Sequence, residues 1–228
     1  MAVHSFDTAD NRRFWSAYGA SYQGANNARP LVALVKNFLG ERILDAGAAD
    51  GSLLRELRRA LPQAAVTGVD LAPKSDDVEA GDLTQLRFPD GAFDTVISSE
   101  VIEHTSPEIT AAILRELLRV LEPRGALILT TPFEEDLAES TVTCPHCDVS
   151  FHRWGHQQTF GAPDFARLAR EHGLAPELLL PVRFNRLRRV AFLGPRLLQT
   201  AAVQRFYRGE RGKRSLVMVA RRVRRSGS

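Results

Sequence analysis

Strand and helix patterns alternate along the chain from about residue 30, and this alternation constrains the fold more than any other feature. Helical patterns occur at residues 30–39, 51–61, 107–121 and 162–172. Strand patterns occur at residues 42–45, 65–70, 93–98, 125–131, 174–181 and 214–221, with a short one just before Gly81. Strands that alternate with helices form βαβ units, whose parallel strands are covered by helices on both faces. The sequence therefore predicts an α/β fold, with a doubly wound and mainly parallel seven-stranded sheet in a single domain over residues 1–228.

Two segments interrupt the alternation. Residues 133–160 read as an irregular insertion that contains cysteine and histidine, and residues 183–213 as a basic insertion before the last strand. From residue 182 to the end, 14 Lys or Arg side chains accompany the single acid Glu210. Such an asymmetry suggests an anionic partner, and an Arg-rich surface that is only solvated is the alternative.

The composition narrows the class of protein. No run approaches the about 18 apolar residues of a transmembrane helix, and residues 1–7 lack the pattern of a secretory signal. Two cysteines cannot build a disulfide scaffold. We therefore expect a cytoplasmic protein, with peripheral contact at the inner face of the membrane as a further option for the basic end.

The sharpest motif follows the first strand and reads Ile43-Leu44-Asp45-Ala46-Gly47-Ala48-Ala49-Asp50-Gly51. It resembles the Asp-x-Gly-x-Gly-x-Gly motif of the class I S-adenosylmethionine-dependent methyltransferases, in a Rossmann-like fold. Asp45, Gly47 and Gly51 match, and Ala49 replaces the middle glycine. The resemblance implies that these residues bind the cofactor at the carboxyl end of the first strand, where open α/β sheets hold ligands.

Later motifs follow in the order of that family, over about residues 30–180. Asp70, before Leu71, stands where the family has the acid that accepts the ribose hydroxyls, and Asp82-Leu83 where it places an acid near the adenine amino group. A nicotinamide dehydrogenase would require Gly-x-Gly-x-x-Gly, which residues 47–52 do not supply. The combination favours methyl transfer from S-adenosylmethionine.

A third constellation is Glu100-Val101-Ile102-Glu103-His104, whose three polar residues would share one face of a helix. It resembles Glu-x-x-Glu-His of the ubiquinone-pathway O-methyltransferases and a related motif of small-RNA 2′-O-methyltransferases. In those families the motif binds a divalent cation together with a later histidine, a place that His156 fills here. In the alternative, Glu100 helps bind the cofactor while Glu103 and His104 orient one another. His104 serves as a general base in either version, because an imidazole titrates near neutral pH.

The cysteines stand at Cys144 and Cys147, before His152 and His156. A Cys-x-x-Cys with nearby histidines has the ligand chemistry of a compact structural zinc knuckle. A free cysteine pair in a loop is the alternative, and His156 would be claimed by both metal hypotheses.

Taken together, the residues and the resemblance predict an S-adenosylmethionine-dependent methyltransferase that methylates oxygen on a small molecule or a glycan- or lipid-linked intermediate. Zinc or magnesium is a further cofactor under the metal hypotheses. An RNA methyltransferase is the alternative, and RNA is the weaker choice of partner because no RNA-binding module is recognisable. A catalytically silent, methyltransferase-like interaction protein is the third reading, against which Asp70, Asp82 and the Glu-x-x-Glu-His pattern speak.

Overall fold

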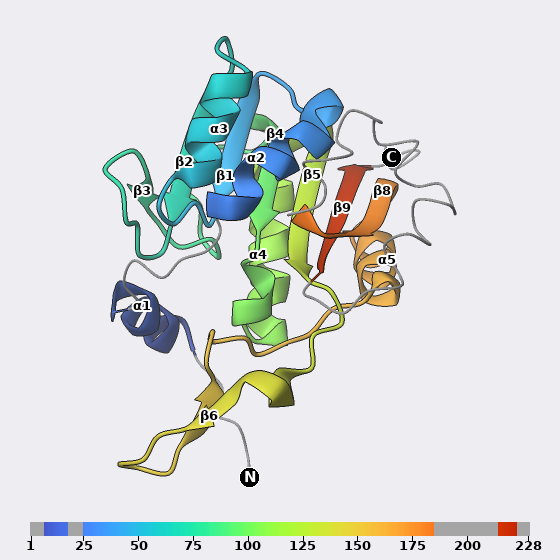
Figure 1. The fold of residues 1–228 in the computed structure, drawn as a ribbon. Coiled ribbons are helices and arrows are strands. Elements are labelled where there is room, and N and C mark those ends of the chain that lie inside the picture. The colour runs from blue at the N-terminus through green and yellow to red at the C-terminus, as the bar shows by residue number, and fades with distance from the viewer. Residues whose placement is uncertain (1–6, 18–24, 185–213, 223–228) are drawn as a thin grey trace.

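The computed structural model describes residues 7–17, 25–184 and 214–222, and its centre is a seven-stranded sheet with helices on both faces (Figure 1). The strand order is β3-β2-β1-β4-β5-β9-β8. These strands are β1 (Arg42–Ala46), β2 (Ala65–Asp70), β3 (Glu79–Ala80), β4 (Phe93–Ser99), β5 (Leu121–Pro132), β8 (Leu174–Val182) and β9 (Ser215–Arg222). Only β9 runs antiparallel to its neighbours β5 and β8. The predicted doubly wound, mainly parallel sheet of seven strands is confirmed.

Helices flank the sheet or cover its edge. They are α1 (Thr8–Ala17), α2 (Ala25–Val35), α3 (Ser52–Ala60), α4 (Pro107–Val120) and α5 (Ala162–Glu171), with 3-10 turns at Lys36–Phe38, Ile102–His104 and Leu137–Ser140. Helix α2 begins five residues before the predicted start and contains Pro30. No helix among these described residues is long and apolar enough to cross a membrane.

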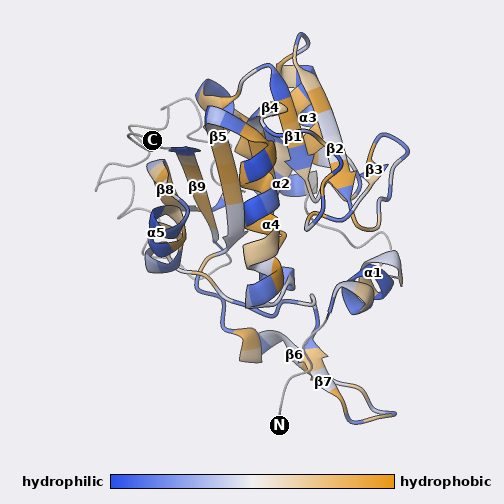
Figure 2. Ribbon diagram, turned by 180° about the vertical axis from the view of Figure 1, so that it is seen from behind, coloured by the Kyte–Doolittle hydropathy of each residue, from blue (hydrophilic) through white to orange (hydrophobic). Residues whose placement is uncertain are grey.

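Successive strand residues face opposite layers of the core, as the two-residue repeat of a strand requires. Leu44 and Val96 pack on one face with Leu117 of α4 and Phe165 of α5. The other face of the sheet packs against α2 and α3, through residues such as Ile43, Ile97, Leu31 and Leu54. Hydrophobic colour along β5 and β9 in Figure 2 reflects strands that are buried on both faces over most of their length, whereas β8, at the edge of the sheet, also has exposed residues.

The segment at 133–160, predicted to be irregular, contains regular structure. Its ends meet in a parallel bridge between Phe133 and Phe160. Between them lie a 3-10 turn and a hairpin of two short strands, β6 (Thr141–Thr143) and β7 (Ser150–His152), which projects away from the sheet (Figure 1). We refer to residues 133–160 as the excursion. The basic insertion predicted at 183–213 lies outside the described residues from residue 185 onward.

Candidate functional site

The main cavity opens at the carboxyl ends of β1, β2 and β4, the edge at which parallel α/β sheets hold ligands. Helix α1 covers it, because Arg12 Nη1 donates to the Leu71 carbonyl at 3.1 Å and Lys74 Nζ to the Ser16 carbonyl at 2.9 Å. Of the predicted site residues, eight line this cavity: Gly47, Ala49, Asp70, Leu71, Asp82, Leu83, Glu100 and His104. The structure thus brings the predicted cofactor residues and the predicted base to one cavity.

Backbone hydrogen bonds hold the Asp70 carboxylate in place at the end of β2. Oδ2 accepts from the Ala49 N–H at 2.9 Å, and Oδ1 accepts from the Ala72 N–H at 2.8 Å. Burial raises the pKa of this carboxyl, and the two backbone donors act in the opposite direction. Each carboxylate oxygen keeps a second acceptor site, so Asp70 can still bind a diol.

The loop after β1 has a backbone that suits close approach. Gly47 has φ of 90°, and a Cβ there would lie 2.3 Å from Val101 Cγ2, so this position requires glycine. Ala49, which replaces the family's middle glycine, also lies in the left-handed region with φ of 45°. Gly51 is the residue before α3, with φ of 73°, and does not line the cavity.

Asp45 lies in a smaller pocket that adjoins the main cavity through Gly47 and Glu100. Its Oδ2 is buried without a hydrogen-bond partner among the described residues. Burial, and then the charges of Asp70 and Asp50, raise the pKa of this carboxyl to about 7. A buried acceptor beside the glycine loop fits the cationic amino end of a bound S-adenosylmethionine, so the residues present suit the expected cofactor.

Glu100, Glu103 and His104 do not share the face of a helix, the arrangement that their spacing would give in a helical segment. Glu100 has φ of 55°, which no helix accommodates, and only Ile102–His104 form a 3-10 turn. The Glu100 side chain instead accepts from Thr130 Oγ1 at 2.9 Å, while Glu103 and His104 turn toward His156. Helical spacing therefore did not bring these residues together.

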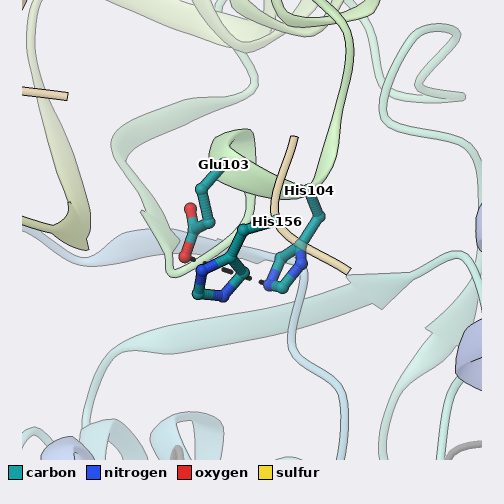
Figure 3. Close-up of side chains that lie close together, drawn as sticks. All are labelled: Glu103, His104 and His156. Carbon is teal, nitrogen blue, oxygen red and sulfur yellow. Dashed lines mark ion pairs between the residues drawn. The ribbon is translucent and has the colours of Figure 1, made fainter. Parts of the chain in front are cut away.

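Figure 3 shows Glu103 and His104 on this turn and His156 reaching them from the excursion. One ligand atom from each of the three lies within 4.8 Å of the other two. The turn is fixed by the excursion, because Gln157 N–H donates to the Glu103 carbonyl at 2.7 Å and Gln158 Nε2 to the Thr105 carbonyl at 2.7 Å. Two segments distant in sequence thus build one polar cluster.

The ionisable side chains of this cluster receive few hydrogen bonds from their surroundings. Both carboxylate oxygens of Glu103 are buried without a hydrogen-bond partner among the described residues, and burial followed by the charge of Glu100 holds its pKa well above the usual range. Burial, and then the neighbouring His156, hold the pKa of His104 well below the usual range. A lowered pKa favours the neutral form of the His104 imidazole, which is the form that can accept a proton.

A second group beside this one consists of Glu135, His152 and His156. His156 Nδ1 is hydrogen-bonded to Glu135 Oε2, and His152 Nδ1 accepts from the His156 backbone N–H at 3.1 Å. Among the described residues neither metal-ligand group contains a cysteine. The structure does not bring Cys144 and Cys147 together with His152 and His156, because the cysteines lie at the hairpin tip and the histidines at its base.

Three site residues have no counterpart in the sequence prediction. Trp15 and Asn11 of α1 line the cavity, and the Trp15 and His104 rings meet edge to face with centroids 4.7 Å apart. Glu135 follows β5 in an acidic run at residues 134–136, and that position after a strand is the signal that could have identified it. Helix α1 precedes the alternating patterns and gives no comparable signal.

Comparisons with known proteins agree with this geometry. Residues 19–179 match the model of a family described as "Methyltransferase domain". The malonyl-[acyl-carrier protein] O-methyltransferase of Serratia marcescens is 35% identical over 111 residues, which are 44% of this chain and 42% of that protein. The chain spans less than half of the length of the first curated relatives it matches.

Solved structures show the same fold at low sequence identity. The [4+2]-cyclase SpnF has a TM-score of 0.62 at 18% identity, covering 97% of this chain and 99% of that chain. The 1,6-didemethyltoxoflavin-N1-methyltransferase of Burkholderia thailandensis, solved with S-adenosylhomocysteine, has a TM-score of 0.56 at 20% identity, covering 95% and 84%. One of these two is a cyclase, so the fold alone does not fix the reaction.

Proposed function

Because this chain belongs to the class I S-adenosylmethionine-dependent methyltransferase family, we propose that it transfers a methyl group to an oxygen of a small molecule or of a glycan- or lipid-linked acceptor. The observation that carries the proposal is the shared cavity, which Asp70, Asp82 and His104 line together. S-adenosylmethionine supplies an electrophilic methyl group when it is bound. The chain's own residues must then orient an acceptor and remove its proton.

Each end of the cavity has a defined task in this proposal. Asp70 would accept the ribose hydroxyls, Asp82 would face the adenine and Asp45 the methionyl ammonium. His104 would take the acceptor's hydroxyl proton as that oxygen forms its bond to the methyl carbon, and Glu103 would orient or stabilise His104, whose Nε2 lies 3.9 Å from Glu103 Oε1. Asn11, whose buried Oδ1 has no hydrogen-bond partner among the described residues, could bind either ligand.

A methyl-transfer screen tests the proposal. Purified protein and labelled S-adenosylmethionine are incubated with separated small-molecule, glycan, lipid and RNA fractions, and His104→Ala serves as the matched inactive control. Label in small molecules or glycolipids that is lost with the variant supports O-methyl transfer. Label in RNA alone favours the RNA reading, whereas cofactor binding with no label in any fraction favours the silent interaction protein.

The orphaned carboxylate of Glu103 favours a second candidate, the same transfer assisted by a divalent cation at Glu103, His104 and His156. Glu135 accepts a hydrogen bond from His156 Nδ1, which leaves Nε2 of that imidazole with a lone pair for a metal. The neighbouring His152 is less suited, because its Nδ1 is an acceptor and the ring proton then lies on Nε2. This set of one carboxylate and two imidazoles combines two types of ligand that suit Mg²⁺, Mn²⁺ or Zn²⁺.

Mn²⁺ binding, followed by electron paramagnetic resonance, tests this candidate without any turnover. Glu103→Gln and His156→Ala should each abolish the bound signal, while Glu108→Gln, at an exposed position in the first turn of α4, should leave it unchanged. Protein that takes up no Mn²⁺ and turns over fully in chelator would exclude a cation.

Peripheral binding to an anionic membrane remains a proposal that rests on the charge of the C-terminal region. Exposed Lys or Arg beside anionic lipid contributes about 1 kcal/mol each, so a few contacts suffice for reversible attachment. Sedimentation with anionic vesicles should fall with salt and on replacement of Arg224 and Arg225 by glutamine, which leaves β9 intact, with cofactor affinity kept as the control. Equal binding to neutral vesicles would contradict an electrostatic attachment.

A further inference from the structure

The β6–β7 hairpin has two chemically different faces. In its antiparallel register Val142 lies opposite Phe151 and Thr143 opposite Ser150. The Cys144 N–H donates to the Val149 carbonyl at 2.9 Å, which extends this register by one pair. Directly opposed residues share a face and the faces alternate along each strand, so Val142, Cys144, Val149 and Phe151 lie on the same face.

One of these faces is packed on the protein and the other is not. Ser150 and His152 are buried, with exposed fractions of 7% and 2%, so their face is turned to the protein. On the opposite face Val142 and Val149 are 38% and 41% exposed, and they are the exposed large apolar side chains of the described part of the chain. The hairpin therefore presents a small apolar strip that includes a cysteine, at the end of a projection from the body (Figure 1).

The tip of the hairpin carries both cysteines on one tight turn. The Asp148 N–H closes this turn on the Cys144 carbonyl at 3.0 Å, and Asp148 has φ of 55°. Two cysteines at Cys-x-x-Cys spacing form a zinc ligand pair, and cysteine binds zinc as the thiolate.

Among the described residues of one chain, nothing completes this pair to a zinc site. A structural zinc ion takes four ligands, and the described histidines at the base of the hairpin are grouped with Glu103, His104 and Glu135. The whole sequence contains two cysteines, so a single chain cannot form a site of four thiolates. A second copy supplies an identical pair, and a two-fold axis through the metal would make the contact self-complementary.

We propose that two copies of this chain dock through the outer faces of their β6–β7 hairpins and share one Zn²⁺, held by Cys144 and Cys147 of each copy. The four thiols lose their protons as the four Zn–S bonds form. Val142, Val149 and Phe151 of the two copies would pack around the metal and leave water. The site is separate from the transfer cavity and does not depend on the reaction proposed above.

The first measurement combines zinc content with mass in solution, using the full chain. Elemental analysis should find about one zinc per two chains, and sedimentation velocity should find a dimer that dissociates on chelation and reforms with added ZnSO₄. Substitution of cobalt for zinc should give the ligand-field spectrum of a tetrahedral site with four thiolates. About one zinc per monomeric chain, or no zinc uptake at all, would overturn the proposal.

Substitutions distinguish the contribution of the metal to the dimer from that of the apolar contact. Cys144→Ser with Cys147→Ser should abolish both zinc and dimer and should lower the unfolding temperature to that of the chelated wild type, while the S-adenosylmethionine affinity stays unchanged because the tip lies away from the cavity. Val142→Thr with Val149→Thr should weaken the dimer with the cysteines intact. His4→Ala with His146→Ala is the matched control, because it removes two histidines that belong to neither histidine group and that could complete a zinc site within one chain. This variant should keep zinc and dimer. A dimer that survives the cysteine changes, or zinc lost in the control, would contradict the shared site.

Discussion

The cofactor edge (the loops that follow β1 and β2 at the cavity) and the excursion bring charged side chains to the same rim of the sheet, but they differ in the hydrogen bonds that those side chains receive. Asp70 receives two backbone N–H groups from Ala49 and Ala72, both within loops that directly follow β1 and β2. Glu103, which the excursion covers, has two buried oxygens that receive no hydrogen bond from the described residues. The difference lies in whether neighbouring backbone or distant side chains surround the charge.

This contrast shows which part of the site is complete without a ligand. At the cofactor edge the acceptors are held in position before anything binds, which lowers the cost of binding. In the cluster of Glu103, His104 and His156, a carboxyl group and one imidazole come from a single turn and the second imidazole from the excursion, and the cluster has an open place for a proton or a cation. Substitutions there should therefore alter chemistry more than binding.

The largest effect is expected for His104→Ala. Loss of a general base costs about 10²- to 10⁴-fold in kcat, whereas the Michaelis constant for S-adenosylmethionine should change little because Asp70 and Asp82 remain. In the wild type, activity should fall with decreasing pH only below the usual range of histidine, because the pKa of His104 is lowered. Steady-state kinetics across pH measures both effects.

His172→Ala, at the end of α5, is the matched control and should retain full activity. A His104→Ala enzyme with kcat within a few-fold of the wild type would remove His104 from the reaction. In that case the cluster of Glu103, His104 and His156 would not differ from the cofactor edge by a role in the chemical step.

The next effect concerns the pH dependence of stability at Asp45. Its pKa of about 7 in the folded state exceeds the unfolded value of about 3.9, so the folded state retains a proton that the unfolded state releases. The retained proton adds to the free energy of unfolding, and this addition is complete below about pH 4. As the pH rises toward 7 the addition is lost, which lowers the free energy of unfolding by at most about 4 kcal/mol. Urea unfolding of the wild type and Asp45→Asn at several pH values measures the difference in slope.

The variant should lack this loss, so its stability relative to wild type should increase over the same pH range. Saturating S-adenosylmethionine should reduce the difference, because a cation beside Asp45 favours the ionised carboxylate. Parallel curves for the two proteins would show that Asp45 ionises in the folded state as it does in water.

The two regions also differ in how far the sequence could predict them. Asp45, Asp70 and Asp82 were identified by their resemblance to the ordered motifs of the family, which lie at or near strand ends. The order of parallel strands brings such positions to one edge. The seven strands were identified for a related reason, since their apolar runs and the helical repeats between them are local patterns.

The chemical cluster depends on long-range contacts that no local pattern contains. Helical spacing suggested that Glu100, Glu103 and His104 share a face, but the left-handed Glu100 excludes a helix. The contact with His156 instead depends on Gln157 and the fold of the excursion. Trp15 was missed because α1 reaches the cavity only through tertiary contacts.

A smaller effect is expected for Asp70→Ala at the cofactor edge. The variant removes hydrogen bonds to a charged group, which are worth about 1.5–3 kcal/mol, or about 10- to 150-fold in the dissociation constant for S-adenosylmethionine. Calorimetry measures the affinity, and Asp76→Ala, an exposed acid on the same loop, controls for the loss of one negative charge. Equal affinity in wild type and Asp70→Ala would show that the backbone, without the carboxylate, binds the cofactor.

The smallest effect is expected at Ala49, the one non-glycine residue of the loop after β1 that adopts a positive φ. The left-handed conformation costs an L-residue about 1–2 kcal/mol. Glycine avoids this cost but loses more conformational entropy on folding than alanine, which lowers stability by about 0.5–1 kcal/mol. Ala49→Gly should therefore raise the free energy of unfolding by about 0.5–1 kcal/mol, with the Ala49 N–H still bonded to Asp70 and cofactor affinity kept. Ala48→Gly, beside it and buried, is the matched control and should lower stability, because that residue has no strain to relieve. If both glycines lower stability equally in urea unfolding, Ala49 is not strained, and the cofactor edge is as relaxed as its hydrogen bonds suggest.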